Sequence, residues 1–415
     1  MTIRNLTPKV GGSLQEYRAV VGDEAVDEIL RLAEPLRGAR ILHLSVLSFG
    51  TLTSELLSTL VPLMGGAGLY AEWQAIQGTA EQHAAITNMY EALGGNFTSW
   101  TPKERERWQQ YNDLHAGLLD KDYDFVVVHD PQPAGVLTSR IVRYGKRPPG
   151  RWIWHCHLDL AAAQPEVWDL LRPHLEAYDA VVYSSEEYVR SDLKTGHSAV
   201  IPPAIDPLSP RNVPLSDEVV GEVLTRHGLD RSRPLIVQVA RLDRFSDPLG
   251  ALEIYRLAKA RMPELQLLLV AMMRENDLSA QIRYEQAARA MAYDTSARLL
   301  SSLNNLGYTE INAFQRAGRV ALQTGVRKGH DLSILEAMWK GRPVVADRRG
   351  VGLSIEGVVS LLGSTPEECA DNILQVLSHP ARASSIGSAA HSYVRRRFLI
   401  TRYLCDYLRL FQGLL

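Results

Sequence analysis

The sequence predicts an α/β protein with two domains, each built on a doubly wound parallel sheet. Short apolar runs alternate with longer amphipathic stretches along the chain, which is the pattern of βαβ units. Several of these runs are apolar throughout, as expected of strands that are covered by helices on both faces. With 415 residues, the chain is also too long for one ordinary hydrophobic core.

Each apolar run is expected to form a strand and each amphipathic stretch a helix. The expected strands are Ile41–Leu47, Phe125–Val128, Trp152–Trp154, Ala180–Tyr183, Ala199–Ile201, Leu235–Val239, Leu267–Ala271, Val320–Leu322, Val344–Ala346 and Val358–Leu361. The expected helices include Thr53–Leu63, Val167–Ala177, Pro248–Arg261 and Leu332–Trp339. Where such strands end, helix N-termini present free N–H groups, so a diphosphate would bind well at that edge of the sheet.

A proline-rich segment divides the chain almost evenly. Four prolines occur within the nine residues Pro202–Pro210, and proline disfavours helix and favours a stiff, extended connection. We therefore expect an N-terminal domain over residues 1–205 and a C-terminal domain over residues 206–391. Residues 392–415 have the pattern of one helix with aromatic and leucine anchors, which is expected to pack back onto the first domain.

Composition excludes several classes of protein. A net charge of -2 gives no bulk attraction for nucleic acid or for an anionic membrane. The three cysteines are far apart and odd in number, which fits neither a disulfide framework nor a zinc site. The N-terminus lacks a signal-peptide pattern, and no run of about 18 apolar residues is present to span a bilayer. These features predict a cytoplasmic protein.

Seven short motifs occur in order along the chain. They are Ser48-Phe49-Gly50, His129–Pro133, Cys156–Asp159, Pro202–Ser209, Arg241–Phe245, Asn312–Ala317 and Glu336–Gly341. Together they resemble the trehalose synthases that join a sugar nucleotide directly to glucose, which are retaining glycosyltransferases of the GT-B fold. The resemblance runs from about Tyr17 to the C-terminal helix. It implies two Rossmann-like domains facing across a cleft, the first for the acceptor and the second for the nucleotide-sugar.

The resemblance also implies which residues hold the donor. A departing nucleoside diphosphate gains negative charge, which an enzyme stabilises with cations and N–H donors. Arg241 matches the family arginine on the donor phosphates and is expected to be catalytic; the alternative is a surface arginine at a strand end. Glu336 matches the acid that holds the ribose hydroxyls; the alternative is a glutamate favoured by the helix dipole. Leu303 and Asn304 match the site of the base.

On the acceptor side, the resemblance implies a group of polar residues after two strands. His157 matches a histidine that faces the donor sugar and is expected to be catalytic; the alternative is a satisfied core histidine. His129 and Asp130, together with Gln132 and Asp159, are expected to shape the acceptor pocket. Asp130 before a proline could equally be a turn residue.

No metal or other cofactor is expected. By strand alternation, His155, His157 and Asp159 could all point the same way. His155-Cys156-His157 nevertheless lacks further ligands at the usual spacing, and no Asp-x-Asp pair falls at the end of a cleft-facing strand.

Four departures from the family pattern fall in or near the implied site. Gly50-Thr51-Leu52 stands where the family has three glycines, and Ser246 stands where it has a lysine five residues after the arginine. The family segment Glu-Gly-Phe-Gly becomes Lys328-Gly329-His330-Asp331, which precedes Leu332, and a later glycine pair becomes Arg349-Gly350. Gly50, Ser246, Lys328 to Leu332 and Arg349 are therefore included among the expected site residues, with Arg349 on the acceptor side.

Loss of one active-site donor or charge typically costs roughly 3 kcal/mol of transition-state stabilisation. Trehalose synthesis is therefore not the first expectation. We expect a retaining transfer from a GDP- or UDP-sugar to a small acceptor, with an unusual pair of substrates from antibiotic biosynthesis, such as a lincosamide-type GDP-octose and ergothioneine. Lys328 or Arg349 would then meet an anionic group. Trehalose synthase proper, a pseudo-glycosyltransferase and a catalytically silent sugar-nucleotide binder stay open as alternatives. So does a homodimer, and no nucleic acid or membrane partner is expected.

Overall fold

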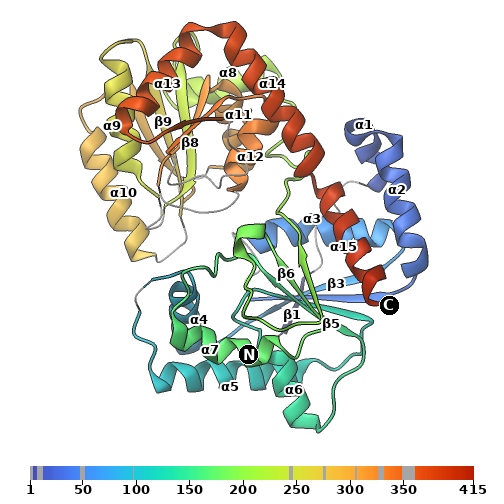
Figure 1. The fold of residues 1–415 in the computed structure, drawn as a ribbon. Helices are drawn as coiled ribbons and strands as arrows, with labels where there is room; N and C mark the ends of the chain where they lie inside the picture. The colour runs from blue at the N-terminus through green and yellow to red at the C-terminus, as the bar shows by residue number, and fades with distance from the viewer. Residues whose placement is uncertain are drawn as a thin grey trace. The chain divides into compact units, whose positions relative to one another are not determined.

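The computed structural model describes residues 3–6, 13–46, 52–96, 98–242, 246–273, 277–303, 306–325, 331–347 and 360–415. The chain divides into two compact units (Figure 1). Unit 1 comprises Met1–Pro203 and Ile400–Leu415, and unit 2 comprises Ala204–Leu399. Each unit is a sheet covered by helices, as the alternation of strand and helix patterns predicted.

Unit 1 contains a sheet of seven strands in the order β1-β3-β2-β4-β5-β6-β7. All neighbouring strands are parallel except β1 and β3, which are antiparallel. The strands are β1 (Ile3–Leu6), β2 (Arg40–Ser45), β3 (Tyr70–Ile76), β4 (Phe125–His129), β5 (Arg151–Cys156), β6 (Ala180–Tyr183) and β7 (His197–Val200).

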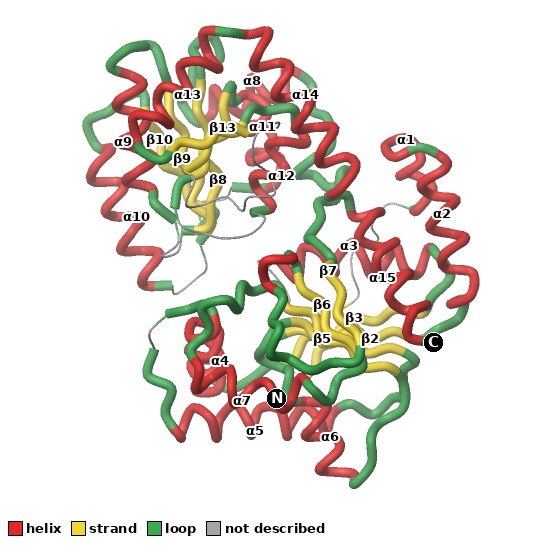
Figure 2. The backbone as a smooth tube through the Cα atoms, in the orientation of Figure 1, coloured by secondary structure: helices red, strands yellow, loops and turns green. Residues whose placement is uncertain are grey.

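Helices cover both faces of this sheet (Figure 2). Helices α4 (Ala80–Leu93), α5 (Pro102–Leu118), α6 (Val136–Tyr144) and α7 (Pro165–Leu175) form one layer. The other side carries α1 (Arg18–Val21), α2 (Asp23–Ala33), α3 (Leu52–Gly66) and α15 (Ile400–Leu414). Because side chains alternate along a strand, Leu42, Val128 and Trp154 pack in the core beneath α4–α7, whereas the ring of Phe125 stacks on Phe411 of α15.

Unit 2 contains six parallel strands in the order β10-β9-β8-β11-β12-β13. They are β8 (Leu235–Arg241), β9 (Gln266–Met272), β10 (Ala297–Ser301), β11 (Val320–Gln323), β12 (Val344–Asp347) and β13 (Ser360–Gly363). The helices are α8 (Asp217–Arg226), α9 (Pro248–Lys259), α10 (Leu278–Met291), α11 (Tyr308–Ala317), α12 (Leu332–Trp339), α13 (Pro366–Ser378) and α14 (Pro380–Arg397). Separate apolar clusters lie on the two faces, one against α9 and α13 and one against α8 and α11.

The expected single helix over residues 392–415 is wrong. Helix α14 ends at Arg397, and α15 begins at Ile400. Between them, Phe398 leaves the helical conformation, its carbonyl accepts a hydrogen bond from the N–H of Ile205, and Leu399 forms a β-bridge with Ile205. A long-range contact thus interrupts the helix, and only the segment from Ile400 onward belongs to unit 1.

Among the described residues, no helix combines the length and apolarity needed to cross a membrane. The three cysteines, Cys156, Cys369 and Cys405, are all buried, and none of them forms a disulfide.

Candidate functional site

In unit 1 a group of histidines lies where the central strands end. His129 is the last residue of β4 and pairs in register with His155 of β5. His43 lies on the neighbouring strand β2, and its side chain, like those of His129 and His155, is buried. His157 follows the end of β5 and is half-buried. The ring of His157 contacts that of His155, with 4.2 Å between centroids, so these two histidines do share one side of the strand as alternation predicted.

The ring nitrogens of this group are close to one another. Nδ1 of His43 lies 3.0 Å from Nε2 of His129, and Nδ1 of His129 lies 3.3 Å from Nε2 of His157. On its other side, Nδ1 of His157 lies 3.1 Å from Oγ of Ser184. His155 stands apart from this series, since its Nδ1 lies 2.5 Å from the hydroxyl of Tyr407 on α15.

Burial keeps these imidazoles neutral near neutral pH. It lowers the pKa of His43 to about 3. Burial, reinforced by the neighbouring histidines, holds the pKa of His129 and of His155 well below the ordinary value. Burial also lowers the pKa of His157, although the carboxylate of Asp130 opposes this shift. A neutral ring can donate one hydrogen bond and accept one, so this group can position hydroxyls without adding charge.

Asp130 holds the turn after β4 in an unusual conformation. Among the non-glycine residues that the structure describes, Asp130 alone has a positive φ, 67°, which is a strained region for most residues and is better tolerated by Asp. Its Oδ2 accepts a hydrogen bond from the hydroxyl of Thr53, and its Oδ1 accepts one from the N–H of His157. Its own backbone N–H donates to the carbonyl of His155. Asp130 therefore ties together the segments that follow β4 and β5.

Two other residues expected on the acceptor side take local roles. The Oδ1 atom of Asp159 accepts a hydrogen bond from the N–H of Ala161, a turn within its own loop beyond the end of β5. The side-chain Oε1 of Gln132 is buried without a hydrogen-bond partner, while its backbone carbonyl accepts from Asn112.

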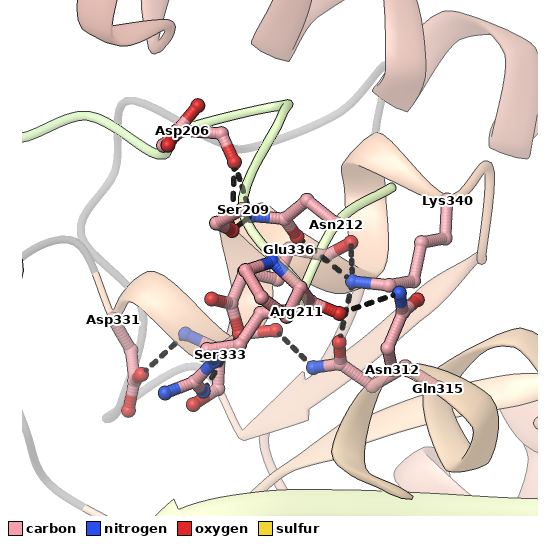
Figure 3. A network of polar contacts seen from close by, with 11 residues as sticks. Asp206, Ser209, Arg211, Asn212, Asn312, Gln315, Asp331, Ser333, Glu336 and Lys340 are labelled. Atoms are coloured by element: carbon pink, nitrogen blue, oxygen red, sulfur yellow. Dashed lines mark hydrogen bonds and ion pairs between the residues drawn. The ribbon is translucent and has the colours of Figure 1, made fainter. Parts of the chain in front are cut away.

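In unit 2, Glu336 forms a buried ion pair. Glu336 lies in the middle of α12, and the residue is 2% exposed. Oε2 of Glu336 accepts a hydrogen bond of 2.8 Å from the guanidinium of Arg211 (Figure 3). Buried carboxylates are held in place when they are paired in this way, so the carboxylate is a fixed anchor.

Lys340 extends the same network (Figure 3). Its Nζ donates to Oδ1 of Asn212 at 2.9 Å, to Oε1 of Gln315 at 2.8 Å and to the backbone carbonyl of Glu336 at 3.2 Å. Three acceptors match the three N–H groups of an ammonium. The side-chain amide of Asn312 also binds this segment, since it donates to the carbonyls of Pro210 and Val213. The network fixes the segment after the proline-rich connection against helices α11 and α12.

The remaining described residues of the expected donor site lie at loop edges of unit 2. Arg241 ends β8 and is half-buried. Ser246 forms a β-bridge with Gly325, which follows β11. Leu303 is 43% exposed just after β10. Asp331 caps α12, since its Oδ1 accepts from the N–H of Ser333 at 2.9 Å, and Leu332 is the first residue of that helix.

Several expected residues lie outside the described part of the chain. They are Gly50, Asn304, Lys328, Gly329, His330 and Arg349.

The structure also adds residues that the sequence did not single out. His43 and Ser184 join the histidines of unit 1, and Arg211 and Asn212 join Glu336 and Lys340 in unit 2. The only sequence signals were a histidine in a buried strand and polar residues directly after the proline-rich segment.

Comparison with known proteins extends over nearly the whole chain. A family model described as trehalose synthase, N-terminal domain, matches residues 43–190. The chain is 35% identical to trehalose synthase of Pyrococcus horikoshii over 407 residues, which are 97% of this chain and 96% of that protein. It is 38% identical to trehalose synthase of Rubrobacter xylanophilus over 407 residues, 97% of both chains.

A solved structure titled "OtsA apo structure" has the same fold. It superposes with a TM-score of 0.73 at 15% sequence identity and covers 90% of this chain and 99% of that one. The expected GT-B fold and glycosyltransferase class are thereby confirmed. The chain belongs to the trehalose synthase family of GT-B glycosyltransferases.

Proposed function

We propose that this enzyme makes trehalose by transferring glucose from a nucleoside diphosphate glucose to free glucose. The observation that carries the proposal is the similarity to trehalose synthases at 35% and 38% identity along 97% of the chain. Trehalose synthase proper was one of the alternatives that the sequence left open. The similarity favours it over an antibiotic-pathway pair such as a GDP-octose and ergothioneine.

On the donor side, the proposal assigns Glu336 to the ribose hydroxyls and Arg241 to the diphosphate. The ion pair with Arg211 supports the first assignment, because it keeps the Glu336 carboxylate in place before a ligand arrives. The position of Arg241 at the carboxyl end of a central parallel strand supports the second. A fixed cation there would stabilise charge that develops on the leaving diphosphate.

On the acceptor side, the proposal assigns Asp130 and the turn that follows His129 to the glucose acceptor and His157 to the donor sugar. The bond between the anomeric carbon and the diphosphate oxygen breaks, and a bond from that carbon to O1 of the acceptor forms. The acceptor's hydroxyl proton leaves with the diphosphate. We infer retention of configuration from the family. We also expect the reaction to need no metal or other cofactor, and measuring activity after dialysis against EDTA would test this expectation.

The experiment is a donor and acceptor panel with the purified full chain. ADP-, GDP- and UDP-glucose are each incubated with glucose, and released nucleoside diphosphate and trehalose are measured together. The proposal predicts equal amounts of both products with at least one donor. Diphosphate release with GDP-sugars and ergothioneine, but none with glucose, would overturn it, and so would binding of donors without any turnover.

Two arginine variants make the panel specific for the assigned site. Arg241→Ala is expected to lower kcat by about 10²–10³, the usual effect of removing one group that stabilises developing charge. Arg289→Ala is the matched control, because Arg289 lies on α10 with an exposed side chain and pairs only weakly with Glu285. Its activity is expected to change by less than about twofold.

A further inference from the structure

The histidines His43, His129 and His157 meet end to end and do not stack face to face. The ring centroids of His43 and His129 are 5.3 Å apart, against 3.0 Å between their facing nitrogens. For His129 and His157 the centroids are 5.6 Å apart, against 3.3 Å between the nitrogens. In both pairs the distance between the ring centroids exceeds the distance between the facing nitrogens by twice the distance from a ring nitrogen to the centre of its own ring. Each nitrogen therefore points straight at its neighbour, which is hydrogen-bond geometry.

Such a series couples the tautomers of its members. A neutral imidazole has one N–H and one lone pair, so each bond in the series needs a donor on one side and an acceptor on the other. His129 and His157 use both of their nitrogens in this way. If one ring adopts a given tautomer, the other two must follow, and only two directions of the whole series are consistent.

The two ends of the series decide the direction. At the inner end, Nε2 of His43 is buried and has no hydrogen-bond partner. A stranded N–H there would be costly, since buried N–H groups without a partner are rarer than acceptors without one. At the other end, the hydroxyl of Ser184 can donate to the carbonyl of Cys156 at 3.5 Å, which leaves its oxygen free to accept from His157. Both ends favour protons on Nδ1 and lone pairs on Nε2.

We propose that His43 and His129 are positioning residues that hold His157 in its Nδ1–H tautomer, with a lone pair on Nε2. His157 then offers an acceptor at Nε2, which suits a sugar hydroxyl and does not suit a phosphate oxygen. A substrate hydroxyl would enter the longer of the two imidazole links, accepting from Nδ1–H of His129 and donating to Nε2 of His157, so that no N–H is left without a partner. This last consequence rests on the proposed contact between His157 and the donor sugar.

A metal ion is the competing explanation for these residues. His129, His155 and His157 each offer one nitrogen within 4.8 Å of the others, and Nε2 of His155 is buried without a partner. In a metal site, however, the nitrogens of His129 and His157 would both aim at the ion. Here they aim at each other, which favours the hydrogen-bonded series.

The test is ¹⁵N NMR of the full chain labelled on its histidines, with correlations that report which ring nitrogen carries the proton. In the absence of substrate, His43, His129 and His157 are expected to show protonated Nδ1 and bare Nε2. His43→Leu is expected to free the tautomers of His129 and His157, so that their signals move toward an equilibrium of both forms. His43→Asn, whose amide can donate from near the position of Nδ1, is expected to restore them.

Kinetics and a control histidine complete the test. In the transferase assay, His43→Leu is expected to lower kcat about tenfold or more with little change in KM for the acceptor, and His43→Asn to recover most of the loss. His115→Asn is the control, since His115 is buried but bonds only to the carbonyls of Tyr111 and Gln77. It is expected to leave the other histidine signals unchanged.

The outcomes are distinct. Protonated Nε2 on His157, unchanged His157 signals in His43→Leu, or one equivalent of tightly bound metal by elemental analysis would each overturn the proposal. If His43→Leu does not fold, the tautomers measured in the native protein and in His43→Asn still test the proposal. The NMR experiment needs no turnover. Its result therefore tests the inference about the tautomers even if the enzyme does not make trehalose.

Discussion

Lys340 makes the stability of unit 2 depend on pH. Its residue is 8% exposed, and its Nζ is surrounded by three acceptors. Burial lowers the pKa of Lys340 to about 7; the carboxylate of Glu336 opposes this shift, and neighbouring arginines add to it. The ordinary pKa of a lysine is 10.5. Folding therefore changes the proton affinity of the Lys340 amine more than it changes the proton affinity of an exposed lysine.

The sign and size of the effect follow from linkage. Between pH 7 and 10.5, the unfolded chain binds more protons than the folded one, so the free energy of unfolding rises with pH. The slope starts at half of about 1.4 kcal/mol per pH unit at pH 7, where the folded-state amine is half protonated, and reaches the full value above it, which gives about 2 kcal/mol from pH 7 to pH 9. Below pH 7 the amine is protonated in both states, the full burial penalty is present, and the slope disappears.

The perturbation that isolates this effect is Lys340→Met, since an unbranched apolar side chain can fill the same space. Urea unfolding of both proteins is followed at pH 7, 8 and 9 by ¹⁹F NMR of 5-fluorotryptophan. Trp339 is the only tryptophan among residues 204–399, so its signal reports unit 2. The native protein is expected to gain about 2 kcal/mol over the variant between pH 7 and pH 9.

A constant difference across this range would refute the reasoning, because it would show that Lys340 keeps its proton in the folded state. The matched control is Lys259→Met. Asp294 and Tyr255 outweigh burial at Lys259, and its pKa is raised, so both states stay protonated up to pH 9 and no such slope is expected.

Three further predictions concern stability and activity. Arg211→Ala leaves the carboxylate of Glu336 buried and unpaired, and is expected to lower the free energy of unfolding of unit 2 by about 3–5 kcal/mol, measured by the same fluorotryptophan signal. Asp130→Ala removes two hydrogen bonds and keeps a positive φ, so thermal unfolding should show a loss of about 2 kcal/mol or more, whereas Asp130→Asn should lose less than half as much. Ser246→Lys restores the family cation and is expected to raise kcat/KM for nucleoside diphosphate glucose about tenfold or more; an unchanged value would remove Ser246 from the donor site.

Strands in the centres of the two sheets were predictable, and strands near their edges were less so. Phe125–His129 and Leu235–Arg241 are covered on both faces and are apolar almost throughout. In contrast, β3 alternates apolar and polar residues and pairs with the edge strand β1, while β10 is itself an edge strand with intermediate burial. Strands that are partly exposed or lie at a sheet edge carry a weaker apolar signal, so all three of these strands were missed.

The candidate site was predictable where a residue resembles a family motif and not where it depends on a distant partner. Glu336 and His157 lie in recognisable motifs. Arg211, the partner of Glu336, and His43, the partner of His129, lie in no such motif: Arg211 is 125 residues from Glu336, and His43 is 86 residues from His129. Which polar side chains meet across such separations is decided by the packing of the sheet, and no periodicity in the sequence encodes it.

The most direct test of the central claim is NMR of the product formed from a nucleoside diphosphate glucose and ¹³C-labelled glucose. We predict a single disaccharide, α,α-trehalose, with the label in one of its two rings and one nucleoside diphosphate released per molecule. A disaccharide with a β-linkage, or release of diphosphate without any labelled disaccharide, would contradict it.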